Sequence, residues 1–158
     1  MQSFSTGRAT RNGKDYMIES SYTIKPIGVI RSDLANRDTA PHQGDEGAPD
    51  AWLELHPAIA EGLEGIAVGD EIIVITWLHQ AHRNMLQVHP RRDTTRPLKG
   101  VFATRSPDRP NPLGLHRVTV LNIHGNRLRV GPLEAIDGTP VVDIKSAFRP
   151  TTASENQS

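Results

Sequence analysis

The sequence predicts a mainly β protein: a small antiparallel β-barrel in a single domain, with one or two short helices. The chain has 158 residues, a length typical of one domain. Short segments rich in β-branched and apolar residues recur along it at near-even spacing and are separated by turn signals. A helical signal is confined to residues 57–63, where Pro57 stands at an early helical position and apolar residues share one face.

Seven segments are expected to form strands: residues 22–30, 52–55, 71–78, 99–104, 115–123, 127–130 and 141–144. The near-continuous apolar run in the third of these predicts the most buried strand. Pro26 lacks a backbone donor, so the first strand is expected at an edge or a bulge. Gly125-Asn126 and Asp137-Gly138 are each typical of a tight hairpin turn.

The two ends of the chain differ in composition from its middle. Residues 1–20 are polar and lack the apolar stretch of a secretory signal, so they are expected to form a flexible N-terminal arm. Residues 150–158 are rich in Ser, Thr, Asn and Gln and are expected to be a disordered tail. The barrel domain is therefore expected over residues 21–149. No apolar run approaches 18 residues, so no membrane-spanning segment is expected.

Composition excludes several classes of function. The chain has no cysteine, which removes disulfide frameworks, thiol nucleophiles and Cys-ligated metal or iron–sulfur sites. It has neither the GxGxxG fingerprint of dinucleotide-binding folds nor the GxxxxGK[ST] phosphate loop.

The net charge is zero, but charges of opposite sign are separated along the sequence. Residues 33–71 hold ten acidic residues against one basic residue, Arg37, which gives a net charge of −9. Residues 83–117 hold eight basic residues against two acidic ones, which gives +6. The basic block favours an anionic partner, although two surfaces that neutralise each other give the same pattern.

The densest candidate for function is the stretch of residues 100–114. Pro107, Pro110 and Pro112 fix their own backbone and extend the residues before them. The stretch is therefore expected to be stiff and to hold Arg105 and Arg109 in place. A loop that is ordered before binding loses little entropy when its ligand arrives.

Histidines cluster after the apolar run of residues 71–78. His79, His82 and His89 resemble a set of metal ligands, but their spacing is looser than zinc sites normally show and no carboxylate completes the set. Hydrogen bonding at the end of a strand fits better, because a neutral imidazole and a carboxamide such as Gln80 can both read a purine edge. No metal site is predicted.

Two further segments carry polar side chains. Pro41-His42-Gln43-Gly44 by itself indicates only a turn. Glu134, Asp137 and Asp143 gather near an otherwise apolar strand, and strand alternation is expected to turn Asp143 away from its neighbours Val142 and Ile144. Asp143 is expected either to pair with Lys145 or an arginine, or to take part in proton or cation chemistry.

Taken together, these segments resemble the TsaA/TrmO family of tRNA methyltransferases. The resemblance is carried by Ile27-Gly-Val-Ile-Arg-Ser32, Leu78-His-Gln80, Gly100-Val-Phe-Ala-Thr-Arg-Ser-Pro107, Arg109-Pro-Asn-Pro112 and Asp137-Gly-Thr-Pro-Val-Val-Asp-Ile-Lys145. It covers about residues 22–148, nearly the whole of the expected barrel domain.

The resemblance implies a protein that binds S-adenosylmethionine on a compact β-barrel, forms a homodimer with the cofactor near the interface, and works in the cytoplasm. It also implies N6-methylation of threonylcarbamoyladenosine beside the anticodon of tRNA. Two alternatives stay open: a methyltransferase for a small molecule or another RNA, and a non-catalytic module that binds S-adenosylmethionine or RNA. The sequence stops shortly after Phe148, so the C-terminal domain that some members carry is expected to be absent.

Motif by motif, the resemblance assigns roles to residues of this sequence. The cofactor-binding residues are expected to be Pro41, His42, Gln43, His79, Gln80, Arg105, Leu115, Asp137, Gly138, Thr139 and Pro140. Beyond these motif matches, the substrate-binding residues are expected to be Arg91, Arg92, Arg96, Arg109 and Asn111, with the arginines of the basic block meeting tRNA phosphates. Asp143 is the expected proton acceptor because it lies beside the expected cofactor turn. The sequence departs from the family at His42, where members have arginine, and at Glu134-Ala135, where they tend to have Asp-Leu.

Overall fold

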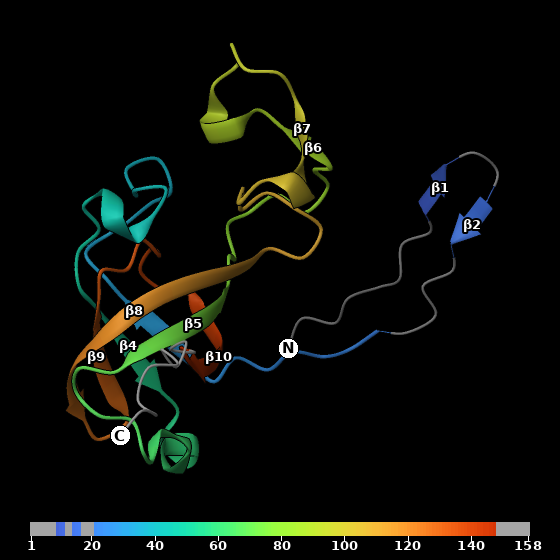
Figure 1. Ribbon diagram of the computed structural model, residues 1–158. Helices are drawn as coiled ribbons and strands as arrows, with labels where there is room; N and C mark the ends of the chain where they lie inside the picture. The colour runs from blue at the N-terminus through green and yellow to red at the C-terminus, as the bar shows by residue number, and fades with distance from the viewer. Residues whose placement is uncertain (1–8, 12–13, 17–20, 148–158) are drawn as a thin grey trace, which may run out of the picture.

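Six strands form a closed antiparallel barrel in the computed structural model, which describes residues 9–11, 14–16 and 21–147. Around the barrel the strands follow the order β10, β3, β4, β9, β8 and β5, and β5 closes against β10 (Figure 1). Their bounds are β3 (Gly28–Arg31), β4 (Ala51–Leu55), β5 (Glu71–Trp77), β8 (Leu113–His124), β9 (Arg127–Gly131) and β10 (Pro140–Ser146). The predicted fold class, a single-domain antiparallel β-barrel, is confirmed.

Alternate side chains along the strands point into the barrel and form its core. In β4, Ala51, Leu53 and Leu55 are buried, whereas Trp52 and Glu54 between them are partly exposed. The other strands supply the rest of the core: Ile30, Ile72, Val74, Val118, Val120, Leu128, Val130 and Val141, together with Leu133 and Ala135 beyond β9.

The apolar run of residues 71–78 forms β5, as predicted, but only alternate side chains reach the core. Ile72, Val74 and Thr76 are buried, and the residues between them are half-buried on the outer face. The run is apolar on both faces of this strand, whereas only one face lines the barrel interior. The outer face of β5 is therefore a second, half-buried surface outside the barrel core.

Two predicted strands are shorter than expected. Of residues 22–30 only the last three belong to β3; Pro26, which cannot donate to a ladder, lies before the strand, and Tyr22 is 82% exposed. Of residues 99–104 only β7 (Lys99–Gly100) is a strand, paired with β6 (Gln87–Val88). The chain then turns into a 3₁₀ helix, Val101–Ala103, closed by the Thr104 N–H donating to the Val101 carbonyl.

One of the two predicted hairpins is correct. Gly125-Asn126 joins β8 to β9, which pair directly. Asp137-Gly138 forms a turn, and Gly138 has a φ of 80° that favours glycine. It is not a hairpin turn, because β9 already lies between β4 and β8 and so β10 pairs with β3 and β5 instead.

The predicted helical segment is confirmed as a 3₁₀ helix, Pro57–Leu63. Three further 3₁₀ turns cover Gly44–Glu46, Pro90–Arg92 and Val101–Ala103. Each is short, as this helix type usually is.

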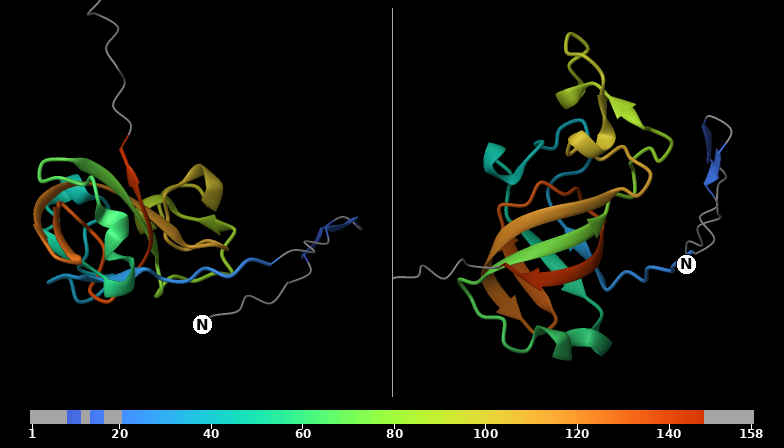
Figure 2. Two further views of the ribbon diagram at one scale, coloured as in Figure 1. Left: turned by 90° about the horizontal axis from the view of Figure 1, so that it is seen from below. Right: turned by 45° about the vertical axis from the view of Figure 1, so that its right-hand side comes forward.

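The connection between β5 and β8 (residues 78–112, the β5–β8 connection) extends away from the barrel and carries the β6–β7 sheet (Figure 2). At the start of the chain, β1 (Ala9–Arg11) and β2 (Lys14–Tyr16) pair as an antiparallel two-stranded sheet. The rest of the predicted N-terminal arm and the tail at 150–158 lie outside the described residues. In the part of the chain that is described, no helix has the length and apolar character needed to cross a membrane.

Candidate functional site

Three connections meet at one end of the barrel, where β3 and β5 finish and β8 and β10 begin. The register fixes this arrangement: Val141 of β10 lies opposite Thr76 of β5, and Trp77 of β5 lies opposite Leu113 of β8. The connections are the β3–β4 loop (residues 32–50), the β5–β8 connection and the β9–β10 turn (residues 132–139). The predicted cofactor-binding residues lie on these connections or on the first residues of β8 and β10.

The β3–β4 loop carries Pro41, His42 and Gln43. The Asn36 side chain organises its first half, because its Oδ1 accepts hydrogen bonds from the backbone N–H groups of Asp38 and Thr39 at 3.1 and 3.2 Å. The second half lies against the β9–β10 turn: a Cβ on Gly44 would stand 3.1 Å from the Pro132 carbonyl oxygen and 3.3 Å from Glu134 Oε2. His42 and Gln43 are exposed.

Hydrogen bonds to the end of β3 hold the predicted turn of Asp137, Gly138, Thr139 and Pro140. The Asp137 N–H donates to the Leu34 carbonyl at 2.7 Å, and Asp137 Oδ1 accepts from the Ser32 N–H at 3.0 Å. The Gly138 N–H donates to the Ile30 carbonyl at 2.8 Å. The buried Thr139 hydroxyl donates to the Ile136 carbonyl at 2.7 Å.

His79 and Gln80 form the corner of a turn directly after β5, closed by the Ala81 N–H donating to the Leu78 carbonyl at 3.0 Å. The Leu78 N–H donates to the Pro112 carbonyl at 2.8 Å, which ties this turn to the start of β8. Both His79 and Gln80 are exposed. Their position at a strand end is as predicted.

The proline-rich stretch is braced from within by Arg109. Its Nε donates to the Ser106 carbonyl at 2.7 Å, and its Nη2 donates to the carbonyls of Val101 and Thr104 at 3.0 and 2.7 Å. The predicted stiffness therefore has two sources, the prolines and this half-buried guanidinium. Arg109 was expected to meet phosphate, but its side chain is mainly committed to backbone carbonyls.

Arg83, which the sequence analysis did not single out, braces the same stretch from outside. Its Nε donates to the Pro110 carbonyl at 2.8 Å, and its Nη2 donates to Asn111 Oδ1 at 3.3 Å. Its guanidinium also lies 5.2 Å from the centroid of the Trp77 ring. Asn111, a predicted substrate contact, is thus held by an arginine from the other side of the β5–β8 connection.

Arg105 and Leu115, both predicted cofactor residues, are neighbours. Arg105 Nη2 donates to the Leu115 carbonyl at 3.3 Å, and the side chains of both residues are exposed. Leu115 lies on the outer face of the barrel, opposite Ile75 of β5.

A buried polar chain lies behind these exposed residues. His116 Nδ1 is 2.6 Å from Glu134 Oε1, and His116 Nε2 is 2.7 Å from the hydroxyl oxygen of Thr76. Burial raises the pKa of the Glu134 carboxyl, but the hydrogen bond from His116, the charge of His116 and the charge of Arg105 together hold this pKa below its usual range. An ionised carboxylate only accepts hydrogen bonds, so His116 Nδ1 carries a proton and donates a hydrogen bond to Glu134.

The predicted substrate-binding arginines on the β5–β8 connection are paired with acids. Arg91 Nη2 lies 2.9 Å from Glu46 Oε1, and Arg92 Nη1 lies 3.2 Å from Asp38 Oδ1. Arg96 pairs locally with Asp93 at 3.3 Å. The first two pairs join the basic block to the acidic β3–β4 loop, so part of the charge separation in the sequence is neutralised across space.

The predicted proton acceptor, Asp143, lies on the outer face of β10 opposite Ile75. One cross-strand row therefore contains Asp143, Ile75 and Leu115. Asp143 Oδ2 pairs with Lys145 Nζ at 3.3 Å, as one of the sequence-based alternatives predicted. Glu134 and Asp137, by contrast, bond to His116 and to the Ser32 backbone.

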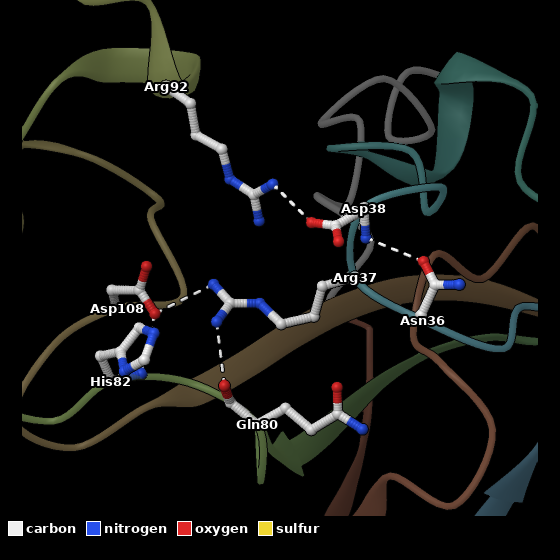
Figure 3. Close-up of a pocket in the computed structure, with 7 residues that line it drawn as sticks. All are labelled: Asn36, Arg37, Asp38, Gln80, His82, Arg92 and Asp108. Atoms are coloured by element: carbon white, nitrogen blue, oxygen red, sulfur yellow. Dashed lines mark hydrogen bonds and ion pairs between the residues drawn. The ribbon is translucent and has the colours of Figure 1, made fainter.

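An open pocket of about 340 Å³ lies where the β3–β4 loop faces the β5–β8 connection (Figure 3). It is lined by Asn36, Arg37, Asp38, Gln80, His82, Arg92 and Asp108. Its volume is at the lower end of the range for small-ligand pockets. Within the described residues, no group of three or more His, Asp or Glu side chains is arranged to hold a metal ion.

Residues 29–151 match the family described as the tRNA-methyltransferase O N-terminal domain. The chain belongs to the TrmO family. This membership places it with the S-adenosyl-L-methionine-dependent methyltransferases and confirms the family to which the sequence motifs pointed.

Relatives of the TrmO domain are similar over most of this chain. A probable S-adenosyl-L-methionine-binding protein of Methanothermobacter thermautotrophicus is 42% identical over 132 residues, which cover 84% of this chain and 94% of that protein. One from Archaeoglobus fulgidus is 45% identical over 122 residues, covering 77% of this chain and 33% of that protein.

Solved TrmO structures share the fold. The crystal structure of TrmO from Pseudomonas aeruginosa superposes with a TM-score of 0.67 at 30% identity, covering 88% of this chain and 60% of that one. A second TrmO crystal structure gives a TM-score of 0.68 at 31% identity, covering 88% of this chain and 63% of the other. This chain thus spans about three fifths of the length of these TrmO chains.

Proposed function

We propose that this chain is a methyltransferase that uses S-adenosylmethionine to methylate N6 of threonylcarbamoyladenosine beside the anticodon of tRNA. The observation that carries the proposal is the convergence of residues 41–43, 79–80, 105, 115 and 137–140 at one end of the barrel. These residues are far apart in the sequence, and in the fold they lie on the three connections described above or on the first residues of β8 and β10.

The side chains at this end suit the chemical groups of the cofactor. The exposed guanidinium of Arg105 can pair with a carboxylate in a planar, two-point arrangement that lysine reproduces poorly. Exposed Leu115 offers an apolar surface, and the carboxylate of Asp137, which already accepts from the Ser32 N–H, can accept further hydrogen bonds from hydroxyl groups. His42 supplies an imidazole where the family has arginine.

The sulfonium cofactor, when bound, supplies an electrophilic methyl group. The protein has then to hold the attacking N–H in line and accept its proton, and alignment of this kind is worth several kcal/mol. We assign the proton to the carboxylate of Asp143, which shares a cross-strand row with Leu115 on the outer face.

Arg91, Arg92 and Arg96 are proposed to contact tRNA phosphates, and Asn111 and Arg109 to keep the proline-rich stretch in the shape that faces the RNA. Phosphates would replace Glu46 and Asp38 as partners of Arg91 and Arg92, which are more than half exposed. Binding of this kind weakens steeply with salt, by a slope close to the number of phosphates neutralised. A tRNA-modifying role also places the protein in the cytoplasm.

A homodimer is proposed because exposed apolar side chains lie beside the candidate site. The β6–β7 region carries Phe102 at 81% exposure and Leu86 at 63%, and the outer face of β8 carries exposed Leu113 and Leu115. A second copy seated on this face would cover Leu115 and enclose the cofactor end of the barrel. Aromatic side chains such as Phe102 are enriched at the centres of protein interfaces.

The second candidate is a methyltransferase for a small molecule or another RNA. It is favoured by one observation, that Arg91 and Arg92 are already paired with acids and so leave less free positive charge for tRNA. A non-catalytic module would bind S-adenosylmethionine or RNA without turnover.

Transfer of a radiolabelled methyl group from S-adenosylmethionine to total tRNA, followed by nucleoside analysis, tests the proposal. Label in N6-methylated threonylcarbamoyladenosine, lost when the tRNA lacks the threonylcarbamoyl group, is the expected result. Label in another nucleoside or only in a small molecule would select the second candidate. Calorimetric binding of S-adenosylmethionine with no transfer to either would indicate the non-catalytic module.

A further inference from the structure

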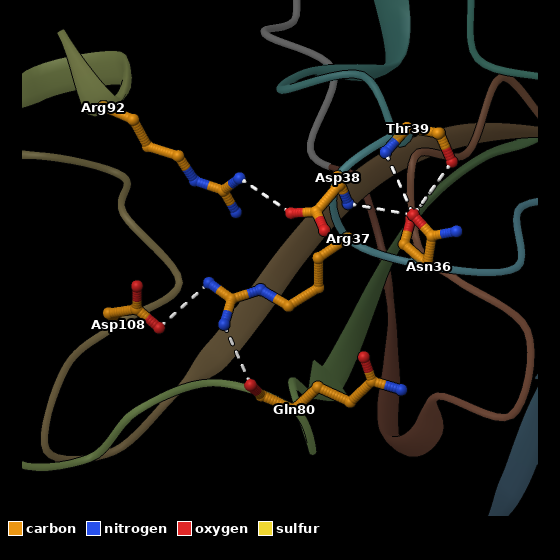
Figure 4. A network of polar contacts seen from close by, with 7 residues as sticks. All are labelled: Asn36, Arg37, Asp38, Thr39, Gln80, Arg92 and Asp108. Atoms are coloured by element: carbon orange, nitrogen blue, oxygen red, sulfur yellow. Dashed lines mark hydrogen bonds and ion pairs between the residues drawn. The ribbon is translucent and has the colours of Figure 1, made fainter.

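Arg37 is the single basic residue of the acidic block, and its side chain lines the pocket. It extends from the β3–β4 loop to the β5–β8 connection (Figure 4). Its Nη1 donates to the Gln80 carbonyl at 2.9 Å, and its Nη2 donates to Asp108 Oδ1 at 2.9 Å. One guanidinium therefore contacts both the turn after β5 and the proline-rich stretch.

Asp108 completes the link between these segments. Its Oδ1 also accepts the His82 N–H at 2.8 Å, so one carboxylate oxygen receives hydrogen bonds from two connections. The Asp108 N–H donates to the Ser106 hydroxyl at 3.3 Å, which orients the residue within its own loop. The Arg37 and Asp108 side chains are 21% and 20% exposed, so this ion pair is partly shielded from water.

The two other ion pairs that join the β3–β4 loop to the β5–β8 connection are more exposed; in the Arg91–Glu46 pair the side chains are 54% and 34% exposed. In the Arg92–Asp38 pair the side chains are 55% and 87% exposed at a longer distance of 3.2 Å. Exposed pairs contribute little, whereas shielded, charge-assisted hydrogen bonds are stronger. The first half of the loop has no strand partner, so the Arg37 contacts are its main tie to the opposite side of the pocket.

We propose that Arg37 is a positioning residue that fixes residues 33–43 against the His79-Gln80 turn, so that the two segments are set for the cofactor before it binds. The inference rests on the proposed function, which gives these segments to S-adenosylmethionine. Arg37 acts through the loop and touches no reacting atom. A lysine has one terminal nitrogen and cannot direct two N–H groups from a rigid plane to the Gln80 carbonyl and Asp108 together.

Two measurements on the full chain test this inference. Hydrogen–deuterium exchange of the ligand-free protein is expected to show faster exchange over residues 33–43 in Arg37→Ala than in wild type. Calorimetry with S-adenosylhomocysteine is expected to show about tenfold weaker binding in Arg37→Ala, because an ordered loop binds at lower entropic cost. Arg37→Lys is expected to recover only part of both effects.

Kinetics and a matched control separate positioning from general stability. In Arg37→Ala the KM for the methyl donor should rise while kcat at saturating donor stays within about twofold, the pattern of lost uniform binding. Arg117→Ala removes an exposed arginine–glutamate pair with Glu71, which lies at the start of β5 and so at the opposite end of the barrel from the site, and should change neither measurement. Arg37→Ala and Asp108→Ala should also be non-additive in binding, because each removes the same contact.

The outcomes distinguish the inference from the proposed function. If wild type binds S-adenosylhomocysteine and Arg37→Ala binds it equally well, or if exchange over residues 33–43 is unchanged, positioning by Arg37 is overturned and the proposed function stands. If wild type does not bind S-adenosylhomocysteine, the proposed function fails, and this inference fails with it.

Discussion

At the scale of single residues, the exposed side chains of the site rest on a buried chain of polar groups. Thr76, His116 and Glu134 are joined by two short hydrogen bonds, and among the described residues every buried side-chain polar atom has a partner. Buried polar groups cost free energy unless they are satisfied in this way. These hydrogen bonds thus fix the buried His116 next to the exposed Leu115 on β8, and hold Glu134 where the charge of Arg105 acts on it.

The lowered pKa of Glu134 allows the Thr76–His116–Glu134 hydrogen bonds to be tested through the stability of the protein. Because the folded state lowers the pKa of this carboxyl below its ordinary value of 4.5, the ionised form stabilises the fold above about pH 4.5, and this stabilisation is lost as the pH falls through the folded-state pKa. Glu134→Gln should therefore lower the free energy of unfolding at pH 7 by about 1–3 kcal/mol, and less at pH 4.

Chemical denaturation at the two pH values checks this prediction. Glu64→Gln, an exposed acid after the 3₁₀ helix Pro57–Leu63, is the control and should leave the free energy of unfolding nearly unchanged. A deficit in Glu134→Gln that is equally large at pH 4 would contradict the assigned role of the charge.

The proposed role of Asp143 as proton acceptor is testable through the rate of turnover. Asp143→Asn removes the proton acceptor but keeps the shape, so kcat should fall by about 10²- to 10⁴-fold while cofactor affinity stays within about twofold. Steady-state methyl transfer and calorimetry measure the two quantities, with the exposed Glu61→Gln as control. Turnover at the wild-type rate would remove Asp143 from the role.

At the scale of elements, Gly114 allows the start of β8 to pack closely against the buried side chains at the site. A Cβ on Gly114 would stand 2.6 Å from His116 Nε2 and would also collide with the Thr76 hydroxyl oxygen. Gly114 is therefore required because the backbone packs closely against the buried side chains of Thr76 and His116. The Arg109 and Arg83 hydrogen bonds hold the rest of the stretch in place.

Gly114→Ala should accordingly lower the free energy of unfolding by about 1–3 kcal/mol, the usual cost of overpacking a filled site. Thermal or chemical unfolding measures the loss. Gly62→Ala is the matched control, because a Cβ there meets nothing within 4 Å and the residue has no positive φ. Equal stability of the two variants would show that the Thr76 and His116 side chains can move to accommodate the added methyl group, and would contradict the prediction.

At the scale of the whole molecule, the two oppositely charged blocks of the sequence face each other. Glu46 and Asp38 pair with Arg91 and Arg92, and Glu71 pairs with Arg117 on neighbouring strands. The neutralising interpretation of the charge pattern therefore holds for part of both blocks. The salt dependence of RNA binding measures how many phosphates are neutralised when such acid–arginine pairs are exchanged.

The proposed dimer is tested at the same scale. Phe102→Asp places a charge in the exposed apolar surface of the β5–β8 connection and should convert a dimer to a monomer in light scattering after gel filtration, because a buried unpaired charge is costly. Val68→Asp is the control: Val68 is 63% exposed and lies in the turn before β5, outside this surface. A wild-type protein that is monomeric at tens of micromolar would contradict the dimer.

Sequence patterns predicted much of the barrel for local reasons. Alternation of apolar residues located β4, β9 and the long β8, and the Gly125-Asn126 turn signal placed the hairpin between the last two. The pattern over residues 22–30 and 99–104 was misleading, because β-branched and apolar residues favour strands only where a partner strand is in reach. The Asp137-Gly138 turn was correctly located, but which strands it joins depends on the closure of the barrel.

By itself, the sequence determined the fold class, the family and the segments that carry polar chemistry, because these follow from residue types at fixed spacing. Only the tertiary structure decided which side chains meet. It turned Arg109 toward backbone carbonyls, joined His116 to Glu134, and brought Arg37 to Asp108 across 71 residues of sequence. Pairings of this length depend on the register and closure of the barrel, which no local pattern encodes.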